Sequence, residues 1–301
     1  MRVISHESTE GNILKVISHQ IPHFSYRNGF SPLPICMKTC DSGWGCCFRS
    51  FQGVLAQFFM KLFDEFPKKY REKYLNLHPL NLFADNEISP FSIHNLVNEA
   101  HKNCNLDPGN WAKPSQMIQT ILPIFQNQGF SVLYSHSNQF SKNSFENLEY
   151  PCMVLIPTLL GLDELDQTFI PFLQLSLCVE GSLGFVSGHN VSAYFIVGFD
   201  ENNFLYFDPH TTLDAVNDLE IDSYYHTKAK RIAYSDLNPS ILLAFFAKNK
   251  NSLKELLFTL SKCSRSPVAF EELSGDNSEH ECLDIDDLEF TPPSDDDNND
   301  N

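Results

Sequence analysis

Residues 41–50 read Asp-Ser-Gly-Trp-Gly-Cys-Cys-Phe-Arg-Ser (DSGWGCCFRS) and place two adjacent cysteines, Cys46 and Cys47, at the start of a helical pattern. From Phe48 to Leu62 the apolar residues recur at the spacing of one helix face. Unpaired N–H groups and the helix dipole favour a thiolate at such a position, so either cysteine could act as a nucleophile. The alternative interpretation is that both are small residues of the core.

Outside this stretch, apolar periodicity predicts further elements. Helices are predicted over residues 91–102, 114–126, 239–246 and 253–261, short strands over 131–134 and 152–157, and a helix or buried segment over 169–178. Two β-rich segments, 191–199 and 204–208, flank Asp200-Glu-Asn-Asn and predict a hairpin. A cysteine-headed helix packed against a later antiparallel sheet is an α+β arrangement.

The cysteine content and the apolar runs bound the class of protein. Nine cysteines, an odd number, accompany a start without the basic-then-apolar pattern of a secretion signal. We therefore expect free thiols in a reducing compartment. The spacings do not form a pair of Cys-x-x-Cys knuckles, so neither a metal nor another cofactor is expected. The apolar runs stop short of the ~18–20 residues of a membrane span, which predicts a soluble, cytoplasmic protein.

The net charge of −17 is concentrated at the C-terminus. Residues 271–301 contain 13 Asp or Glu and no Lys or Arg, which leaves −4 for the rest of the chain. An acidic, Asn-rich end cannot bury enough apolar surface to offset its chain entropy. We therefore expect a folded domain over residues 1–273 and a disordered tail over residues 274–301. The lack of a basic patch argues against nucleic-acid binding.

A second group of candidate catalytic residues is Phe207-Asp208-Pro209-His210, at the end of the predicted hairpin. Residues two apart on an extended segment point to the same face, so Asp208 could orient His210 as a base. The segment could equally be a turn or an Asp-x-His metal pair. His189, which enters the first strand of the hairpin, is a competing base, and spacing alone does not separate the two histidines.

Several motifs, in one order along residues 20–270, together resemble the autophagins, the cysteine proteases that process the ubiquitin-like modifier of autophagy. The nucleophile motif is matched by Asp41-Ser-Gly-Trp-Gly-Cys46, followed by Arg49 and Gln52. The other matched segments are Phe24-Ser-Tyr-Arg-Asn-Gly-Phe30, Ser92-Ile-His-Asn95, Gly109-Asn-Trp111, Leu155-Ile-Pro157, Leu160-Gly-Leu162, Asn190-x-Ser192-Ala193, Asp208-Pro-His-Thr-Thr212 and Leu237-x-Pro239-Ser240. The resemblance implies a papain-like cysteine protease fold with a small auxiliary helical insertion.

The resemblance implies catalytic roles residue by residue. Cys46 takes the place of the nucleophile, and the cysteine after it takes a packing position. His210 takes the place of the general base and Asp208 that of its orienting partner, ahead of His189. Tyr26 matches a tyrosine that helps the cysteine N–H hold the oxyanion.

The resemblance also implies a substrate and a way to hold it. Trp111 would cover the cleft and clamp a C-terminal glycine, and Gly188, His189 and Asn190 fall in a loop that gates the substrate channel. The implied activity is cleavage after the C-terminal glycine of the modifier, both in its precursor and in its conjugate with phosphatidylethanolamine. These two forms are the implied partners, with transient membrane-surface contact through the substrate. The protein itself is expected to be a monomer.

The segment Phe270-Glu-Glu-Leu273 fits an aromatic-x-x-aliphatic peptide that autophagy modifiers bind as an added β-strand. Phe270 and Leu273 are therefore a candidate docking motif. The alternative is that Phe270 simply ends the folded core.

Two other functions are weighed against this one. A related family that processes a different small ubiquitin-fold modifier also pairs Trp-Gly-Cys with Asp-Pro-His. A catalytically inactive protein that only holds the modifier is the alternative from outside the enzymes, but all three chemical positions are present in this chain.

Overall fold

The computed structural model describes residues 10–271, apart from 75–76, 147 and 217–219. The predicted tail over 274–301 lies outside these residues, as does Leu273 of the candidate docking motif. Within the described ranges, no helix is long and apolar enough to cross a membrane. Helices and strands are mixed around one central sheet, which confirms the predicted α+β class.

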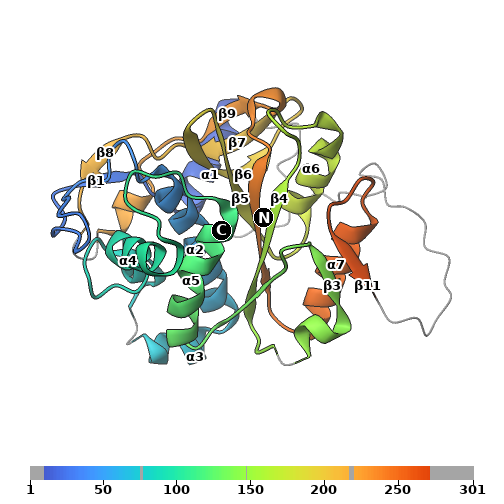
Figure 1. The fold of residues 1–301 in the computed structure, drawn as a ribbon, viewed down its shortest axis with the longest axis horizontal. Helices are drawn as coiled ribbons and strands as arrows, with labels where there is room; N and C mark the ends of the chain where they lie inside the picture. The colour runs from blue at the N-terminus through green and yellow to red at the C-terminus, as the bar shows by residue number, and fades with distance from the viewer. Residues whose placement is uncertain (1–9, 75–76, 147, 217–219, 272–301) are drawn as a thin grey trace, which may run out of the picture.

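A seven-stranded sheet forms the centre of the molecule, in the order β2-β4-β10-β5-β6-β7-β9 (Figure 1). Its strands are β2 (Ser131–Tyr134), β4 (Cys152–Leu159), β5 (Ser182–His189), β6 (Ser192–Phe199), β7 (Asn203–Phe207), β9 (Lys230–Ala233) and β10 (Ser240–Ala247). β2 and β4 are parallel, and the other neighbours are antiparallel. The two predicted short strands are confirmed as β2 and β4, and the predicted hairpin as β6 and β7.

Helices cover both faces of this sheet. In Figure 1, α2, α4 and α5 lie on one side of it, and α6 and α7 lie on the other. The α-helices are α1 (Glu10–Gln20), α2 (Cys46–Glu65), α3 (Pro67–Lys73), α4 (Ile93–Cys104), α5 (Pro114–Asn127), α6 (Ile170–Cys178) and α7 (Lys250–Lys262). Short 3-10 helices are η1 (Pro79–Phe83), η2 (Lys142–Phe145), η3 (Gln167–Phe169), η4 (Ile221–Tyr224) and η5 (Tyr234–Asp236). α2, α4, α5 and α7 confirm four predicted helices, and the ambiguous segment 169–178 contains α6.

The central strand β10 corrects one prediction. Residues 239–246 are predicted to be helical, but this is wrong, because Ser240–Ala247 form a strand in the middle of the sheet. Leu242 and Phe246 belong to the buried cluster that contains α2, whereas Leu243 and Phe245 belong to the cluster with α6 and α7. Because both faces are buried, the strand is an unbroken apolar run, which periodicity cannot tell from a buried helix.

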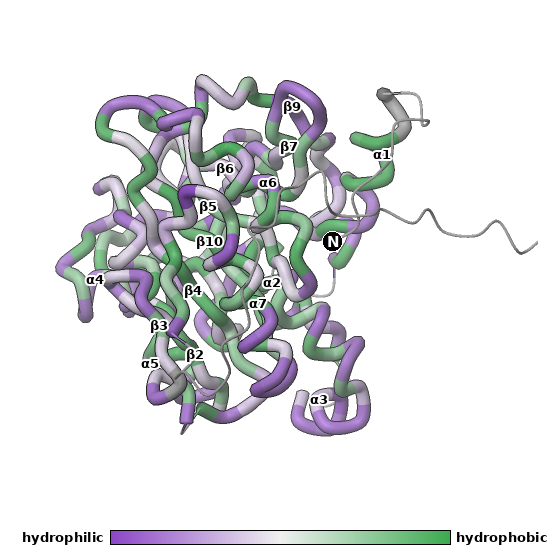
Figure 2. The backbone as a smooth tube through the Cα atoms, turned by 90° about the vertical axis from the view of Figure 1, so that its right-hand side faces the viewer, coloured by the Kyte–Doolittle hydropathy of each residue, from purple (hydrophilic) through white to green (hydrophobic). Residues whose placement is uncertain are grey.

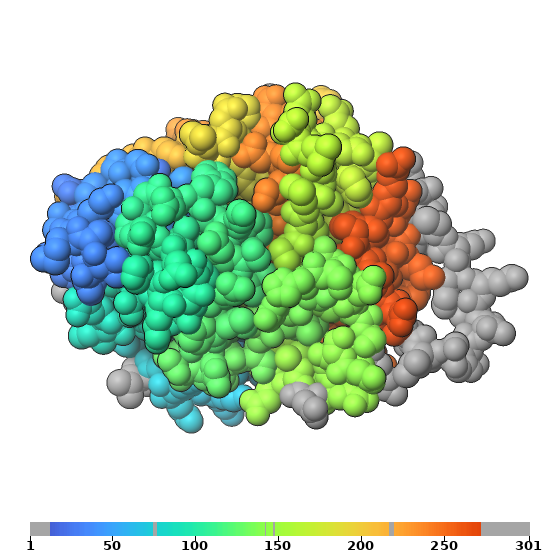
Figure 3. Space-filling model, viewed as in Figure 1, coloured from blue at the N-terminus to red at the C-terminus, as the bar shows by residue number. Residues whose placement is uncertain are grey.

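The distribution of hydrophobic and hydrophilic segments agrees with this layered arrangement. In Figure 2 the tube of β4, at the centre of the view, is hydrophobic, whereas α3 at the lower margin is mostly hydrophilic. In Figure 3 the N-terminal segment and the α4–α5 pair form one side of the molecule. The end of the described chain, α7 and β11 (Ala269–Glu271), forms the opposite side.

Two small parallel sheets fasten the ends of the domain. β1 (Tyr26–Asn28) pairs with β8 (Thr212–Asp214), and β3 (Gln139–Ser141) pairs with β11. The Phe270 ring lies 6.2 Å from the Phe145 ring, centroid to centroid, and packs against the buried cluster that contains α6 and α7. Phe270 is thus part of the fold, as its alternative interpretation expects, and its use for docking stays a prediction.

Candidate active site

The turn before α2 is shaped by two glycines and a buried carboxylate. Gly43 has a φ of +83°, a backbone conformation that residues with a side chain rarely adopt. A Cβ on Gly45 would lie 2.8 Å from the Cβ of Asp41, so only glycine leaves room for that carboxylate. The Gly45 N–H donates to the Asp41 carbonyl at 2.8 Å, and α2 begins with Cys46. Cys46 is therefore held at a helix N-terminus, where the free N–H groups favour an anion.

The end of β7 presents Asp208 and His210. Asp208 Oδ1 accepts hydrogen bonds from His210 Nδ1 at 2.5 Å and from the His210 backbone N–H at 3.1 Å. Asp208 Oδ2 accepts from Lys230 Nζ, at the start of β9, at 2.7 Å. Because Nδ1 is held by Asp208, Nε2 of His210 is left for a second partner.

Two tyrosine rings enclose that imidazole edge-on. The ring centroids of Tyr26 and Tyr194 lie 5.3 Å and 5.9 Å from that of His210. The Tyr26 N–H donates to the Pro209 carbonyl at 2.9 Å, and Tyr26 pairs with Thr212 in the β1–β8 sheet. The chain is therefore fastened on both sides of His210.

The Cys46 sulfur is the point where these elements meet. It is hydrogen-bonded to His210 and to the Tyr26 hydroxyl, and it accepts from the Ala193 N–H of β6. Burial alone would raise the pKa of this thiol, but the hydrogen bond with His210, the Ala193 N–H and the charge of the imidazole lower it. The site thus stabilises a thiolate on Cys46.

His210 has the complementary shift. The hydrogen bond to Asp208 is the largest cause, followed by the one to Cys46, and together they raise the pKa of the imidazole to about 9 against the effect of burial. Burial would raise the pKa of Asp208, but hydrogen bonds from His210 and Lys230 hold it well below its usual range. The shifts of the pKa values therefore favour a thiolate on Cys46 beside an imidazolium on His210 and a carboxylate on Asp208.

The competing candidates lie in different surroundings. Burial raises the pKa of the Cys47 thiol well above its usual range, and its Sγ points to the Ala112 carbonyl at 3.7 Å. His189 ends β5, and its Nδ1 lies 2.6 Å from the Asp236 carbonyl oxygen. The structure brings His210 to Cys46, and it turns His189 towards a different segment.

A small cavity of about 30 Å³ lies against Cys47, the residue that follows Cys46. Its lining includes Cys47, Trp111, Ala112, Gly188 and Ala193. The Trp111 side chain is 45% exposed, so one wall of the cavity is an aromatic ring open to solvent. Gly188, near the end of β5, and Asn238 form another wall. The Asn238 N–H donates to the Gly188 carbonyl at 2.7 Å, and its side-chain amide donates to the Asn190 carbonyl at 3.0 Å. Trp111 and Gly188 therefore share one cavity with Cys47 and with Ala193, the residue whose N–H bonds Cys46, whereas His189 and Asn190 are not among its lining residues.

A buried network of ion pairs lies beneath the site, and the sequence did not predict it. Arg49 Nε lies 2.5 Å from Asp41 Oδ2 and Arg49 Nη1 lies 2.8 Å from Asp85 Oδ1, with all three side chains at most 1% exposed. The second oxygens accept backbone N–H groups, from Arg27 to Asp41 at 2.6 Å and from Val216 to Asp85 at 2.9 Å. The network joins the start of α2 to β1 and to the segment after β8.

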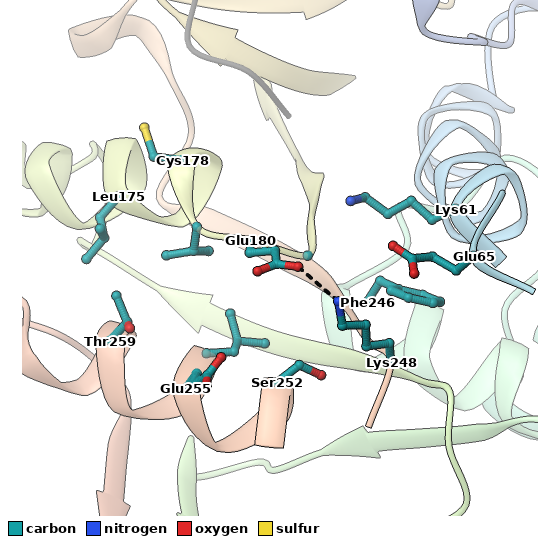
Figure 4. A pocket seen from close by; sticks show the side chains of 13 residues that line it. Lys61, Glu65, Leu175, Cys178, Glu180, Phe246, Lys248, Ser252, Glu255 and Thr259 are labelled. Atoms are coloured by element: carbon teal, nitrogen blue, oxygen red, sulfur yellow. Dashed lines mark hydrogen bonds and ion pairs between the residues drawn. The ribbon is translucent and has the colours of Figure 1, made fainter. Parts of the chain in front are cut away.

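A larger cavity, of about 340 Å³, lies at the other end of α2 (Figure 4). Lys61 and Glu65 of α2 line it, and Lys248 forms a 3.5 Å ion pair with Glu180 at its edge. Because α2 rises about 1.5 Å per residue, this cavity is about 20–30 Å from Cys46 and plays no part in the candidate site. In the described part of the chain, no group of three or more His, Cys, Asp or Glu side chains could hold a metal ion.

Comparison with known proteins gives the family. The Peptidase C54 catalytic domain matches residues 11–258. A "Probable cysteine protease atg4" of Penicillium rubens is 30% identical over 233 residues, which cover 71% of this chain and 58% of that protein. A "Probable cysteine protease ATG4" of Scheffersomyces stipitis is 28% identical over 237 residues, or 71% of this chain and 43% of that protein. The "Cysteine protease ATG4b" of Arabidopsis thaliana is 28% identical over 303 residues, covering 86% and 63%.

The fold and the family together define a papain-like domain of the cysteine-peptidase class. The chain belongs to the Peptidase C54 family, which confirms the resemblance to the autophagins. It spans less than two thirds of the length of these relatives, between 43% and 63%.

Proposed function

We propose that this chain is a cysteine endopeptidase that cleaves after the C-terminal glycine of the ubiquitin-like modifier of autophagy. It matures the precursor and removes the modifier from phosphatidylethanolamine. The observation that carries the proposal is the thiol of Cys46, which sits at a helix N-terminus in contact with His210, itself held by Asp208. Membership of the family supports the substrate class.

The proposed reaction is acyl transfer through a thioester. The Cys46 thiolate attacks the glycine carbonyl carbon, and the Tyr26 hydroxyl with the Cys46 N–H donates to the oxygen that becomes negative. His210 gives its proton to the leaving amine as the C–N bond breaks. His210 then takes a proton from water, whose oxygen attacks the thioester carbon; the C–S bond breaks, the thiolate is released, and the glycine carboxylic acid loses its remaining proton to the solvent. The leaving amine is a peptide in the precursor and phosphatidylethanolamine in the conjugate.

The small cavity near Cys46 supports a preference for glycine. The cavity lies against Cys47 and Ala193, and with a volume of only about 30 Å³ it would leave little room for a larger side chain beside the attacked residue. Trp111 forms its solvent-facing wall, and Gly188 lines it from the end of β5. These residues would clamp an extended C-terminus and exclude folded segments.

The direct test uses two precursors. The protein is incubated with an autophagy modifier that carries a C-terminal extension and, separately, with another small ubiquitin-fold modifier extended in the same way. We expect cleavage of the first only, with an intact mass that ends at the glycine, and release of the modifier from liposomes that contain its lipid conjugate. An uncut autophagy precursor would refute the proposal, and cleavage of the second precursor alone would favour the related family activity.

The shifted pKa values predict a bell-shaped pH dependence of kcat/KM. Activity should rise as Cys46 becomes a thiolate, below the usual pKa of a thiol, and should fall as His210 loses its proton at about pH 9. The reason for the fall is that a neutral imidazole keeps its one proton on Nδ1, against Asp208, and has none on Nε2 for the leaving amine. Initial rates of precursor cleavage from about pH 5 to about pH 10 measure both limbs. An alkaline limb near the usual pKa of histidine, about 6.5, would contradict the imidazolium assignment.

A further inference from the structure

The salt bridge behind Asp208 adds one more residue to the site. We propose that Lys230 is a positioning residue: its ammonium holds one oxygen of Asp208, so that the other oxygen stays on His210. Lys230 Nζ lies 2.7 Å from Asp208 Oδ2, on the side of the carboxylate away from the imidazole. The inference rests on the proposed roles of Asp208 and His210 and extends them by a fourth residue.

Asp208 needs such a partner because its two oxygens are held unequally. Oδ1 accepts both hydrogen bonds from His210, whereas the partner of Oδ2 among the described residues is Lys230 Nζ. The Asp208 side chain is 17% exposed, so without Lys230 its second oxygen would turn to water. The carboxylate could then rotate about its bond to Cβ, and the short contact to Nδ1 would weaken.

The fold places Lys230 at this position by strand register. Lys230 is the first residue of β9 and pairs with Tyr206 of β7, two residues before Asp208. β9 is an outer strand of the sheet, where a lysine often serves only to protect a free edge. Protection of this edge is therefore the alternative role of Lys230. The adjacent Arg231 bonds Asp200 at 2.6 Å, so neighbouring cations of this strand serve different carboxylates.

The groups that face the imidazole make the two roles distinguishable. They are Cys46 from α2, Tyr26 from β1, Tyr194 from β6 and Asp208 after β7. If Lys230 orients Asp208, its loss weakens the hydrogen bond that contributes most to the raised pKa of His210, and this pKa falls. If Lys230 acts only as a nearby positive charge, its loss makes the imidazolium more favourable, and the pKa rises.

The test follows alkylation of Cys46 by iodoacetamide against pH, with the modified residue located by fragment-ion mass spectrometry. The step of this profile at alkaline pH reports the loss of a proton from the His210 imidazole. In Lys230→Met we expect this step to move down by about 0.5 pH unit. Lys230→Arg should restore the original position. Lys228→Met, which removes an equal charge from an exposed lysine two residues away, should leave the profile unchanged.

Turnover of the modifier precursor gives a second readout. Because Lys230 orients the Asp208 carboxylate and touches no substrate, Lys230→Met should lower kcat about fivefold and leave KM unchanged. The effect on kcat is modest because the Lys230–Asp208 ion pair is partly exposed to solvent. An unshifted or raised alkaline step, or an equal effect in Lys228→Met, would overturn the proposal. Lys230→Leu, which likewise has no donor for Asp208, gives the same comparison if Lys230→Met does not fold.

Alkylation needs no substrate, so this result is independent of which modifier the protein cuts. A wild-type profile with a single, ordinary thiol step would refute the thiolate–imidazolium pair and the proposed function together. A shift in Lys230→Met with no cleavage of either precursor would uphold the inference and refute only the substrate.

Discussion

Replacing Cys46 by alanine is expected to lower precursor cleavage roughly 10⁵-fold or more, to the background rate, because no other group at the site can form the thioester. His210→Ala should be nearly as severe, since it removes both the proton for the leaving amine and the main hydrogen bond that lowers the thiol pKa. Cleavage of the extended modifier at matched enzyme concentrations, with folding checked by circular dichroism, measures both effects.

The neighbouring residues provide matched controls for these two substitutions. Cys47→Ala removes an adjacent thiol that is buried against Ala112 and unreactive at neutral pH. It should keep cleavage within about twofold and cost about 1 kcal/mol of stability through the small cavity it creates. His189→Ala should keep substantial activity. An inactive His189→Ala with an active His210→Ala would reverse the assignment of the base.

The contrast between Cys46 and Cys47 shows how far local sequence reaches. Helix periodicity located the start of α2, and it left both thiols equally suited to be a nucleophile. What separates them is contact with Ala193 of β6 and with His210, between β7 and β8, both roughly 150 residues further along the chain. Contacts of that range are set by sheet register, which a single sequence does not encode in any local pattern.

The same limit explains which other parts of the fold and the site could be predicted from the sequence and which could not. The β6–β7 hairpin is predictable because both strands and their turn are contiguous. β10 is not, since a strand buried on both faces lacks the alternation that would reveal it. Lys230 gave no signal either, because it approaches Asp208 only across the β7–β9 pairing. Asp41 and Arg49 stand within the opening motif, but their partner Asp85 is set by the tertiary fold.

Arg49→Met is expected to lower the free energy of unfolding by about 3–5 kcal/mol at neutral pH, the usual cost of leaving buried charges without their partner. Arg49 is fully buried, and its guanidinium neutralises two carboxylates, Asp41 and Asp85, that are themselves at most 1% exposed. Burial would lower the pKa of the guanidinium, but these two charges raise it, so Arg49 is a permanent cation in the fold. Methionine fills a similar volume and leaves both carboxylates in a dry site.

The size and the pH dependence of this loss identify its cause. Burial already raises the pKa of Asp41 despite Arg49, and without the guanidinium it should rise further. An acid whose pKa is raised in the folded state is destabilising above its unfolded pKa, so the deficit of Arg49→Met should shrink as the pH falls towards about 4. Urea unfolding at neutral and mildly acidic pH measures it. Arg231→Met, which breaks a half-exposed pair with Asp200, is the control and should cost less than about 1 kcal/mol. Equal losses in both variants, or a pH-independent deficit, would mean that packing and not charge neutralisation makes Arg49 necessary.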